Sequence, residues 1–291
     1  MWNISPPRAR KPRWLSPIVP ALVTAVLAAF PAGCRKEAST PPPPETKAAP
    51  AAAHEKHWAY EDGSDEAGPS QWGELAGDEA CSAGQRQSPI ALATSGEGAA
   101  LAGAGPQDAF AYKPSKISLV NNGHTVQETY ESGSSLSEGG VTYSLAQFHF
   151  HSPSEHTLDG QSFPLEIHLV HTDSAGKPAL VVGLLVKEGR DNAALDTVFA
   201  SLPKASGDKS EPAGATVDAA ALLPPDRSHF AYDGSLTTPP CTEGIRWRVM
   251  RQSIEMSAAQ IQAYRSLPHL MQTNRPIQPA NGRAVTLIAG Q

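Results

Sequence analysis

The first chemistry that this sequence offers is metal binding by histidine. Residues 147–151 have the sequence Gln-Phe-His-Phe-His, in which polar and apolar residues alternate as they do in a strand. Side chains two positions apart on a strand point to the same face, so His149 and His151 emerge together while the two phenylalanines point the other way. Two imidazoles arranged in this manner can chelate one small cation.

A second strand-like segment surrounds His168. Here Glu166 and His168 share one face, and His171 lies on the opposite face. If the two segments are neighbouring strands, His149, His151 and His168 can converge on one point. Three neutral imidazoles plus a water molecule form the open tetrahedral site that is typical of catalytic zinc. Imidazole also suits copper, nickel and iron, so the type of ligand alone does not select the metal.

Polar neighbours of these histidines suit a supporting role. A histidine that binds a metal usually donates its other N–H group to a fixed acceptor, and Gln147 and Glu166 each lie two residues before a predicted ligand. The alternative is that the histidines are structural, because a lone His-x-His motif is a weak signal. We expect His156 and His171 to be structural. No metal-binding motif includes the remaining histidines outside the turn at 121–124, which are His54, His57, His229 and His269.

The elements that must position these side chains are mostly strands. Four segments are β-branched or alternating and are bounded by turn residues: 117–120, 141–150, 165–171 and 180–186. Two segments have helical spacing, 192–202 and 257–267. No internal repeat is present. The sequence therefore predicts one mixed domain dominated by a sheet, with a few short helices.

Composition and charge narrow the class of protein. Hydrophobic residues make up 40% of the chain, which is enough for a substantial core. The net charge is −6, and the first 34 residues hold four basic residues and no acidic one. The rest of the chain therefore carries 19 basic and 29 acidic residues, a net charge of −10. An acidic body argues against nucleic acid as a partner, because binding phosphate needs a basic face.

The N-terminus has the order of a secretory signal. Basic residues precede an apolar run of 13 residues, 18–30, and small residues follow up to Cys34. This run is shorter than the roughly 20 residues of a membrane span, although an uncleaved, tilted anchor is an alternative. The sequence Ala-Gly-Cys at 32–34 is similar to the end of a bacterial lipobox, with Pro31 as a departure. We predict a signal peptide over 1–34 and a lipid on Cys34; ordinary cleavage is the alternative.

A tether and a folded domain follow. Residues 35–56 contain Pro41 to Pro44 and many alanines, a composition that cannot bury a core and stays extended. The folded domain is expected to span 57–291. Besides Cys34 the chain has two cysteines, Cys81 and Cys241, and an odd total in an exported protein leaves the pairing open.

An ordered series of motifs runs through the predicted domain. They are His57-Trp58-Ala59-Tyr60, Gln87-Ser88-Pro89-Ile90, Asn121-Asn122-Gly123-His124, Gln147-Phe148-His149-Phe150-His151, Ser154-Glu155-His156-Thr157, Glu166-Ile167-His168-Leu169-Val170-His171, Ser235-Leu236-Thr237-Thr238-Pro239-Pro240 and Asn274-Arg275-Pro276. In this order they resemble the α-class carbonic anhydrases over residues 57–291. Ser152 stands where many animal members have tryptophan, as in the bacterial subgroup. The polar insertion at 205–219 has no function that we can assign.

The resemblance implies a role for each matching residue. His149, His151 and His168 match the zinc ligands, and Gln147 and Glu166 match the acceptors that orient two of them. Thr237 matches the hydroxyl that accepts a hydrogen bond from zinc-bound hydroxide, and Glu155 matches the carboxylate that orients Thr237. Thr238 matches a residue beside the substrate, His124 the proton shuttle, and Tyr60 a member of its water network. The apolar wall that receives carbon dioxide is matched by Val170, Val181, Leu236 and Trp247.

Structural alternatives stand beside these roles. Thr237 and His124 could be turn residues, Glu155 a solvated carboxylate, and the apolar wall ordinary core. Members exported by bacteria form a disulfide near Cys81 and Cys241, so the resemblance implies that bridge; two free thiols are the alternative. The fold that it implies is mainly β (α+β), a single domain with a large, mostly antiparallel twisted sheet of about ten strands and short peripheral helices.

The resemblance predicts a zinc enzyme, a carbonate dehydratase of the hydro-lyase class. It would hydrate carbon dioxide reversibly to bicarbonate and a proton, by attack of zinc-bound hydroxide with a histidine proton shuttle. Its predicted place is the bacterial cell envelope or periplasm, held on a membrane by a lipid, and a homodimer is a candidate assembly. Two alternatives remain, a zinc-free relative that acts as a binding module, and a lipid-tethered protein that binds or transports metal.

Overall fold

A computed structural model describes residues 56–63, 65–96, 100–103 and 108–290 of the chain, all within the unit Ala52–Gln291. The predicted signal peptide, Cys34 and all of the predicted tether except Lys56 lie outside the described residues. Among the described residues, no helix is both long and apolar enough to cross a membrane.

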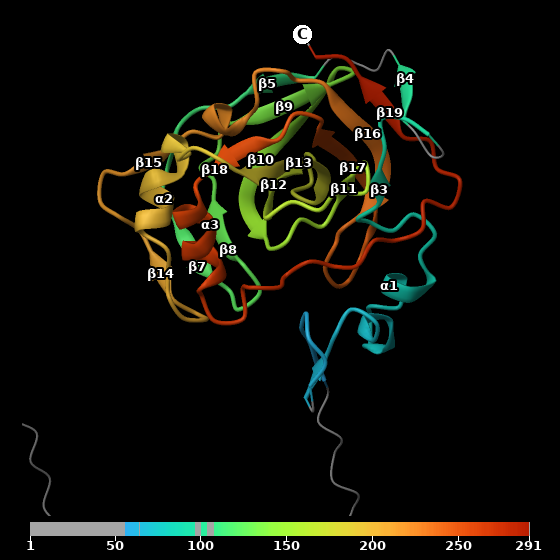
Figure 1. Cartoon of the computed structure of the whole chain (residues 1–291), viewed down its shortest axis with the longest axis horizontal. Coiled ribbons are helices and arrows are strands. Elements are labelled where there is room, and N and C mark those ends of the chain that lie inside the picture. Colours follow the sequence, from blue (N-terminus) through green and yellow to red (C-terminus); the bar gives the residue numbers. More distant parts are fainter. Residues whose placement is uncertain (1–55, 64, 97–99, 104–107, 291) are drawn as a thin grey trace, which may run out of the picture. The chain divides into compact units, whose positions relative to one another are not determined.

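One large sheet organises the described residues (Figure 1). Its main path of ten strands has the order β14 (Lys209–Ser210), β7 (Leu119–Asn121), β8 (Val126–Thr129), β10 (Val141–His151), β12 (Leu165–Thr172), β13 (Pro178–Glu188), β17 (Glu243–Met250), β16 (His229–Ser235), β19 (Thr286–Ile288) and β4 (Leu101–Gly103). Three further strands join beside this path: β5 (Ala109–Ala111), β9 (Ser135–Glu138) and β18 (Ile254–Met256). In the described part of the chain, only β13–β17, β13–β18 and β19–β4 of this sheet pair in parallel, which confirms the predicted, mostly antiparallel sheet.

Short elements surround this sheet. The two-stranded pairs are β1 (His57–Trp58) with β2 (Glu66–Ala67), β11 (Thr157–Leu158) with β3 (Ala91–Leu92), and β15 (Thr216–Val217) with β6 (Ser115–Lys116). The helices are α1 (Ala80–Ala83), α2 (Asp196–Ala200) and α3 (Ala258–Arg265), with 3-10 turns at Trp72–Glu74, Ala193–Leu195 and Ala219–Leu222. Both predicted helical segments are therefore helical in part. The helix α3 begins where predicted because Ser257 and Gln260 form a capping box.

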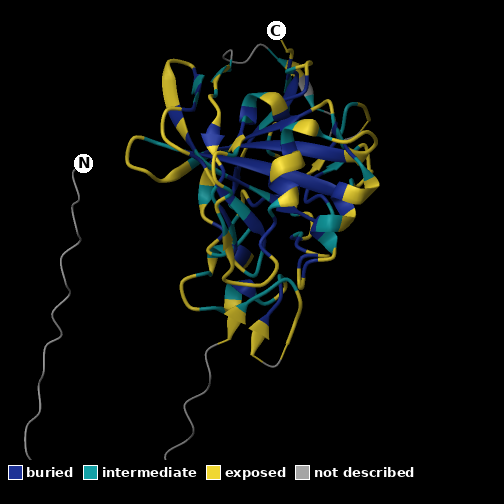
Figure 2. Ribbon diagram, turned by 90° about the vertical axis from the view of Figure 1, so that its left-hand side faces the viewer, coloured by how far each residue is buried: buried dark blue, intermediate teal, exposed yellow. Residues whose placement is uncertain are grey.

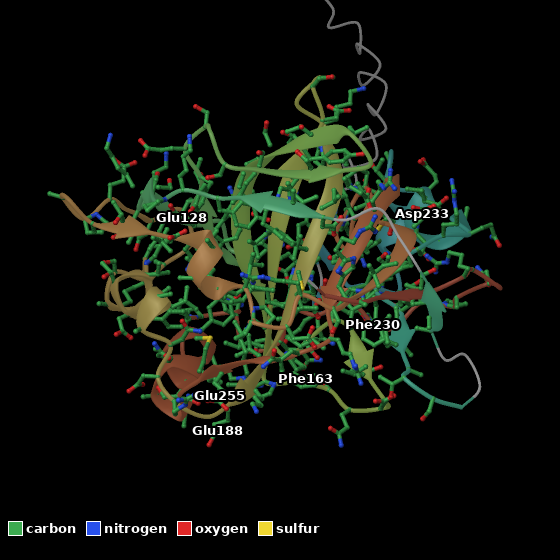
Figure 3. All side chains as sticks on the ribbon, turned by 90° about the horizontal axis from the view of Figure 1, so that it is seen from above. Glu128, Phe163, Glu188, Phe230, Asp233 and Glu255 are labelled. Atoms are coloured by element: carbon green, nitrogen blue, oxygen red, sulfur yellow. A yellow bond between two sulfur atoms is a disulfide. The ribbon has the colours of Figure 1, made fainter. Side chains whose placement is uncertain are left out.

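Alternation along the central strands creates two apolar layers, one on each face of the sheet. Phe148 and Phe150 of β10 join the larger cluster, together with Ile167 and Leu169 of β12. The next residues along the strands face the other way, where Trp247 belongs to a smaller cluster. The central strands are buried and most connecting loops are exposed (Figure 2), and side chains fill the space between the elements (Figure 3). A histidine that alternates with these apolar residues must therefore point into the layer of the smaller cluster.

Candidate active site

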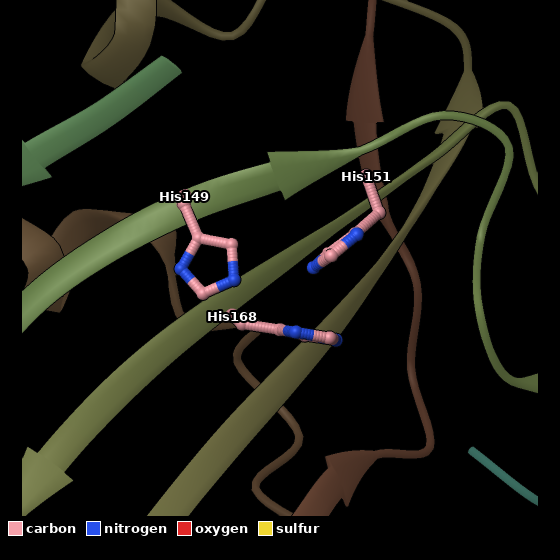
Figure 4. A group of neighbouring side chains, drawn as sticks. All are labelled: His149, His151 and His168. Atoms are coloured by element: carbon pink, nitrogen blue, oxygen red, sulfur yellow. The ribbon is translucent and has the colours of Figure 1, made fainter. Parts of the chain in front are cut away.

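The three predicted ligands come together on one face of the sheet. Strands β10 and β12 are antiparallel neighbours, and their register places His149 opposite His168. His151 lies two residues further along β10, and its ring centroid is 4.5 Å from that of His168. One ligand atom from each of the three histidines lies within 4.8 Å of the others. The three rings point toward a common centre, as Figure 4 shows.

Side-chain acceptors orient two of these rings. The Nδ1 atom of His149 is 2.8 Å from Oε1 of Gln147, and the Nε2 atom of His168 is 2.8 Å from Oε1 of Glu166. Each acceptor fixes a proton on the ring nitrogen that it contacts, so the other nitrogen is left with a lone pair. His149 therefore offers Nε2 to the centre and His168 offers Nδ1. The structure thus places each of the two acceptors that the sequence singled out against its own histidine.

The third acceptor is a backbone carbonyl that no motif had indicated. The Nδ1 atom of His151 lies 2.6 Å from the carbonyl oxygen of Thr273, on the segment after α3. The Nε2 atom of His151 is buried and has no hydrogen-bond partner among the described residues. An orphaned buried nitrogen of this kind indicates a missing ligand. A carbonyl oxygen leaves no mark in the sequence, which is why this contact could not be predicted.

The protonation state of the rings fits a metal. Burial lowers the pKa of His149 well below 6.5 and that of His151 to about 4, and it also lowers the pKa of His168. All three imidazoles are therefore neutral at pH 7, which is the form that binds a metal. Three neutral nitrogen donors, each with its own acceptor, are a donor set that zinc accepts at a catalytic site. The residues present fit a zinc ion.

Glu166 contacts His168, His156 and the backbone of Glu155 at once. Its Oε1 atom also lies 2.7 Å from Nδ1 of His156, and its Oε2 atom accepts hydrogen bonds from the backbone N–H groups of Glu155 and His156. Burial would raise the pKa of Glu166, but His156 and His168 hold it well below its ordinary value. His156, Glu166 and His168 also lie close enough to hold a metal. Because these three already hydrogen-bond to one another, we assign them to support and not to a second metal site.

Glu155 lies against His151 and His168, and Thr237 interacts with Glu155. Glu155 and Thr237 are both buried, and Oε1 of Glu155 accepts a hydrogen bond of 2.8 Å from the backbone N–H of Arg275. Burial raises the pKa of Glu155 to about 7, while the nearby His168 and hydrogen bonds from Arg275 and Thr237 oppose this rise. A cation at the histidines would favour the ionised carboxylate further. The structure thus pairs the two residues that the sequence had placed in one role.

The predicted apolar wall lies next to these groups. Val170, Val181 and Trp247 are nearly fully buried, and the partly buried Leu236 packs against their cluster. Val181 pairs with Val170 on one side and with Trp247 on the other, so the three form a row across β12, β13 and β17. The ring centroid of Trp247 is 4.8 Å from that of His168. Thr238 is half-buried, and its carbonyl accepts a hydrogen bond from the backbone N–H of Cys241.

His124 and Tyr60 share a cavity of about 500 Å³. The backbone N–H of His124 donates to Oδ1 of Asn122 in a tight turn, and its half-buried ring stacks on Trp58 at 3.7 Å between centroids. Burial lowers the pKa of His124, and the carboxylate of Glu66 partly opposes this shift. The ring centroid of Tyr60 is 6.5 Å from that of His151. Tyr60 thus lines the cavity and lies near one of the three histidines.

The predicted disulfide is present. Cys81 and Cys241 are bonded, with their Cα atoms 5.0 Å apart and 160 positions between them in the sequence. The carbonyl of Cys81 accepts from the buried guanidinium of Arg275, and the carbonyl of Cys241 accepts from the amide of Gln87. The bridge therefore joins helix α1 to the segment that follows Thr237 and Thr238.

Comparison with known proteins agrees with this geometry. The family model of eukaryotic-type carbonic anhydrases matches residues 67–289. The chain belongs to this family. It is accordingly an enzyme of the lyase class. A carbonic anhydrase of Pectobacterium atrosepticum is 40% identical over 230 residues, which cover 79% of this chain and 90% of that protein.

Solved structures of carbonic anhydrases share the fold. The α-carbonic anhydrase of Thermovibrio ammonificans, in complex with the inhibitor sulfanilamide, superimposes with a TM-score of 0.73 at 38% identity and covers 79% of this chain and 99% of its own. Dioscorin complexed with ascorbate is similar too, with a TM-score of 0.72 at 32% identity, 81% coverage of this chain and 99% of its own. A fold can host more than one function, so the function of this chain must be argued from its site.

Proposed function

We propose that this protein hydrates carbon dioxide reversibly to bicarbonate and a proton, with zinc held by His149, His151 and His168. The observation that carries the proposal is the set of three neutral imidazoles. Each has one nitrogen fixed by an acceptor and the other directed to a common centre, beside an apolar wall. This combination suits a hydrolytic or hydrating metal site better than a transport site, which would need no apolar pocket.

When bound by these three histidines, zinc would supply the nucleophile, since in carbonic anhydrases as a family it lowers the pKa of a coordinated water to about 7. In this mechanism the buried Oε2 atom of Glu155, which has no other hydrogen-bond partner among the described residues, accepts a hydrogen bond from the hydroxyl of Thr237. Oγ1 of Thr237 can then only accept a further hydrogen bond. An attacking O–H group that donates to this oxygen has its lone pair turned away from Thr237. The Glu155–Thr237 pair thereby orients the attacking oxygen toward the substrate.

The apolar wall binds and orients the substrate. Carbon dioxide has no net charge or dipole, so a pocket of Val170, Val181, Leu236 and Trp247 holds it by burial and not by hydrogen bonds. The same side chains exclude water from one side of the reacting centre. Bicarbonate is charged and strongly hydrated, so this wall favours release of the product once it forms.

His124 carries the product proton from the cavity to buffer. Its imidazole lies on the wall of a cavity that is also lined by Tyr60, whose ring centroid lies 6.5 Å from that of His151. Histidine is the side chain whose charge changes in the neutral range, which suits a relay. We expect His124→Ala to slow hydration about ten-fold in weak buffer and imidazole buffer to restore it. Turnover in weak buffer that equals that of the wild type would contradict the shuttle.

The chain itself can be tested directly. The full chain, purified without tag histidines, should retain about one zinc per molecule and hydrate carbon dioxide in a stopped-flow assay with a pH indicator. Removal of zinc by a chelator and addition of a sulfonamide should each abolish the activity. Zinc without hydration would favour a metal-binding protein, and hydration that survives chelation would contradict the proposed mechanism.

We also propose that the protein is exported and is anchored to a membrane of the bacterial envelope through a lipid on Cys34. The support is the order of basic, apolar and small residues before that cysteine. Metabolic labelling with a palmitate analogue should mark the wild-type protein and leave Cys34→Ser unmarked. A wild type that takes up no label would refute the anchor.

A further inference from the structure

The cavity beside His124 contains a second imidazole that the proposed function does not use. We call it the mouth cavity and define it by six of its lining residues: Tyr60, Glu61, Glu66, His124, His269 and Met271. No motif connects His269 with His124, and 145 positions separate them. The fold brings the turn after α3 to the same cavity as the turn between β7 and β8.

The backbone fixes the position of His269. It lies in the left-handed region with φ of 63°, a conformation that histidine adopts more readily than most residues do. Leu267 and Leu270 on either side are buried, and the backbone N–H of Leu270 donates to the carbonyl of Leu267. These two anchors hold the turn against the body of the protein. His269 itself is exposed, at the cavity mouth.

The imidazole of His269 is available for proton exchange. Within the described residues its ring has no hydrogen bond, ion pair or ring contact, so water can reach both nitrogens. His124 differs, because its ring is stacked on Trp58 and burial lowers its pKa, which weakens it as a base. Glu61 and Glu66 line the same cavity and place two carboxylates on its wall.

We propose that His269 is a second proton-exchange residue that works in parallel with His124. Water in the mouth cavity gives the proton released by hydration to a ring nitrogen of His269, which becomes an imidazolium. The imidazolium then gives the proton to a buffer base, and the neutral ring is restored. This inference rests on the proposed function, because it needs a reaction that releases a proton beside Tyr60.

Asparagine is the substitution that tests the role, since it tolerates positive φ and cannot relay a proton. We would compare the full-length, zinc-loaded wild type with His269→Asn, His124→Ala and the double variant, in weak and in strong imidazole buffer. His57→Asn is the matched control, because His57 is also exposed but lines a different cavity, one without His124 or Tyr60. Zinc content and melting temperature confirm that each variant is folded and loaded.

Two parallel proton routes, through His124 and through His269, lead to a definite prediction. In weak buffer, His269→Asn should lower the hydration rate at least about two-fold in the His124→Ala background, and strong imidazole buffer should remove the difference. His57→Asn should change neither rate. An active wild type whose rate is unaffected by His269→Asn in both backgrounds overturns the second route and leaves the proposed function intact. A wild type without hydration activity overturns both.

A second measurement does not depend on activity. Imidazole added at constant pH to the metal-free protein should shift the NMR signals of the His124 and His269 rings together, because a buffer molecule in the mouth cavity meets both. The His57 signal should stay unchanged. If the His124 signal responds and the His269 signal does not, buffer does not exchange protons at His269 and the inference fails.

Discussion

At the scale of single residues, the site depends on which nitrogen of each ring is free. His149 and His151 offer Nε2, because their Nδ1 atoms contact Gln147 and the Thr273 carbonyl, whereas His168 offers Nδ1 because Glu166 holds its Nε2 atom. A ring with the wrong tautomer would present a proton and not a lone pair to a cation. The acceptors are therefore as necessary to the site as the ligands.

His168→Ala should abolish retention of zinc, because the two remaining imidazoles, both from β10, supply only two of the three ligands. The matched control is His171→Ala, on the same strand β12. Its ring faces the other way and lies 2.8 Å from the hydroxyl of Tyr112. Zinc content after dialysis should fall to background in the first variant and stay near the wild-type level in the second. Full metal content in His168→Ala would refute the assignment of this ligand.

At the scale of elements, strand β16 supports the proposed zinc ligand of β12, His168, through the neighbouring His156. The hydroxyl of Tyr232 lies 2.6 Å from Nε2 of His156 and 3.0 Å from the hydroxyl of Ser88. The hydroxyl of Tyr232 donates to Ser88, and its oxygen lies against Nε2 of His156, whose Nδ1 atom lies 2.7 Å from Oε1 of Glu166. A chain of hydrogen bonds thus runs from Ser88 through Tyr232 and His156 to the carboxylate that orients His168.

Tyr232→Phe should therefore lower zinc affinity as well as stability. The lost hydroxyl leaves a buried ring nitrogen unsatisfied, at a cost of about 1–2 kcal/mol in the free energy of unfolding. Zinc affinity, measured by competition with a chelator, should fall up to about ten-fold. Tyr112→Phe is the matched control, because it removes a hydroxyl from His171, which is not a ligand. Equal zinc affinity in the two variants would show that the chain of hydrogen bonds does not reach the metal.

Strand β8 carries a carboxyl group where the fold would favour an apolar side chain. Glu128 is fully buried, and its paired residues Leu119 and Phe148 both belong to the larger apolar cluster. Its Oε2 atom accepts from the backbone N–H of Ser118, and Oε1 has no partner among the described residues. Burial raises the pKa of Glu128 from 4.5 to about 7, against the opposing hydrogen bond from Ser118.

This raised pKa fixes the sign of a stability change with pH. The folded state prefers the protonated Glu128, so its contribution is present below pH 4.5 and is lost as the pH rises to about 7. Glu128→Gln should leave stability at pH 4.5 nearly unchanged and raise it at pH 8 by up to about 3 kcal/mol. Urea denaturation at both pH values measures this. The exposed Glu131 is the control, since Glu131→Gln should not stabilise at pH 8; equal effects of both substitutions would contradict the argument.

At the scale of the whole molecule, local patterns and distant contacts differ in how well the sequence reveals them. Alternation alone placed His149 and His151 on one face of a first strand and His168 on a second strand. The ordered motifs implied a sheet of about ten strands, and the main path of the sheet has ten. The Thr273 carbonyl, by contrast, reaches His151 across 122 positions. His269 lines the mouth cavity because the turn that follows the end of α3 at Arg265 leads to it.

Buried charges were the other feature that the sequence could not reveal. Arg248 of β17 alternates with apolar residues, a pattern that predicts a solvent-facing side chain. In the structure it is buried beside Glu138 of β9 and Asp108. His229 lies 3.4 Å from the same Asp108. Pairs of this kind become visible only when the strands that carry them are assembled, because a charged residue is buried only if its partner is there to meet it.

The disulfide is the contact that acts on the molecule as a whole. It closes a loop of 160 residues, for which the chain-entropy model gives about 4–5 kcal/mol of stabilisation. It also lies beside the site, because the N–H of Cys241 donates to the carbonyl of Thr238, and Arg275 holds the carbonyl of Cys81 with its side chain and Glu155 with its backbone. Loss of the bridge should therefore loosen both Thr238 and Glu155.

We expect the variant with Cys81→Ser and Cys241→Ser to unfold at lower urea concentration than the wild type and to hydrate carbon dioxide more slowly. Cys34→Ser is the matched control, since it removes a cysteine outside the bridge and should change neither property. A reductant should move the wild type toward the double variant and leave the variant itself unaffected, which separates loss of the bridge from an effect of the two serines. If the reduced wild type kept both its stability and its rate, the bridge would contribute to neither, and the other contacts of Arg275 would suffice to hold the site.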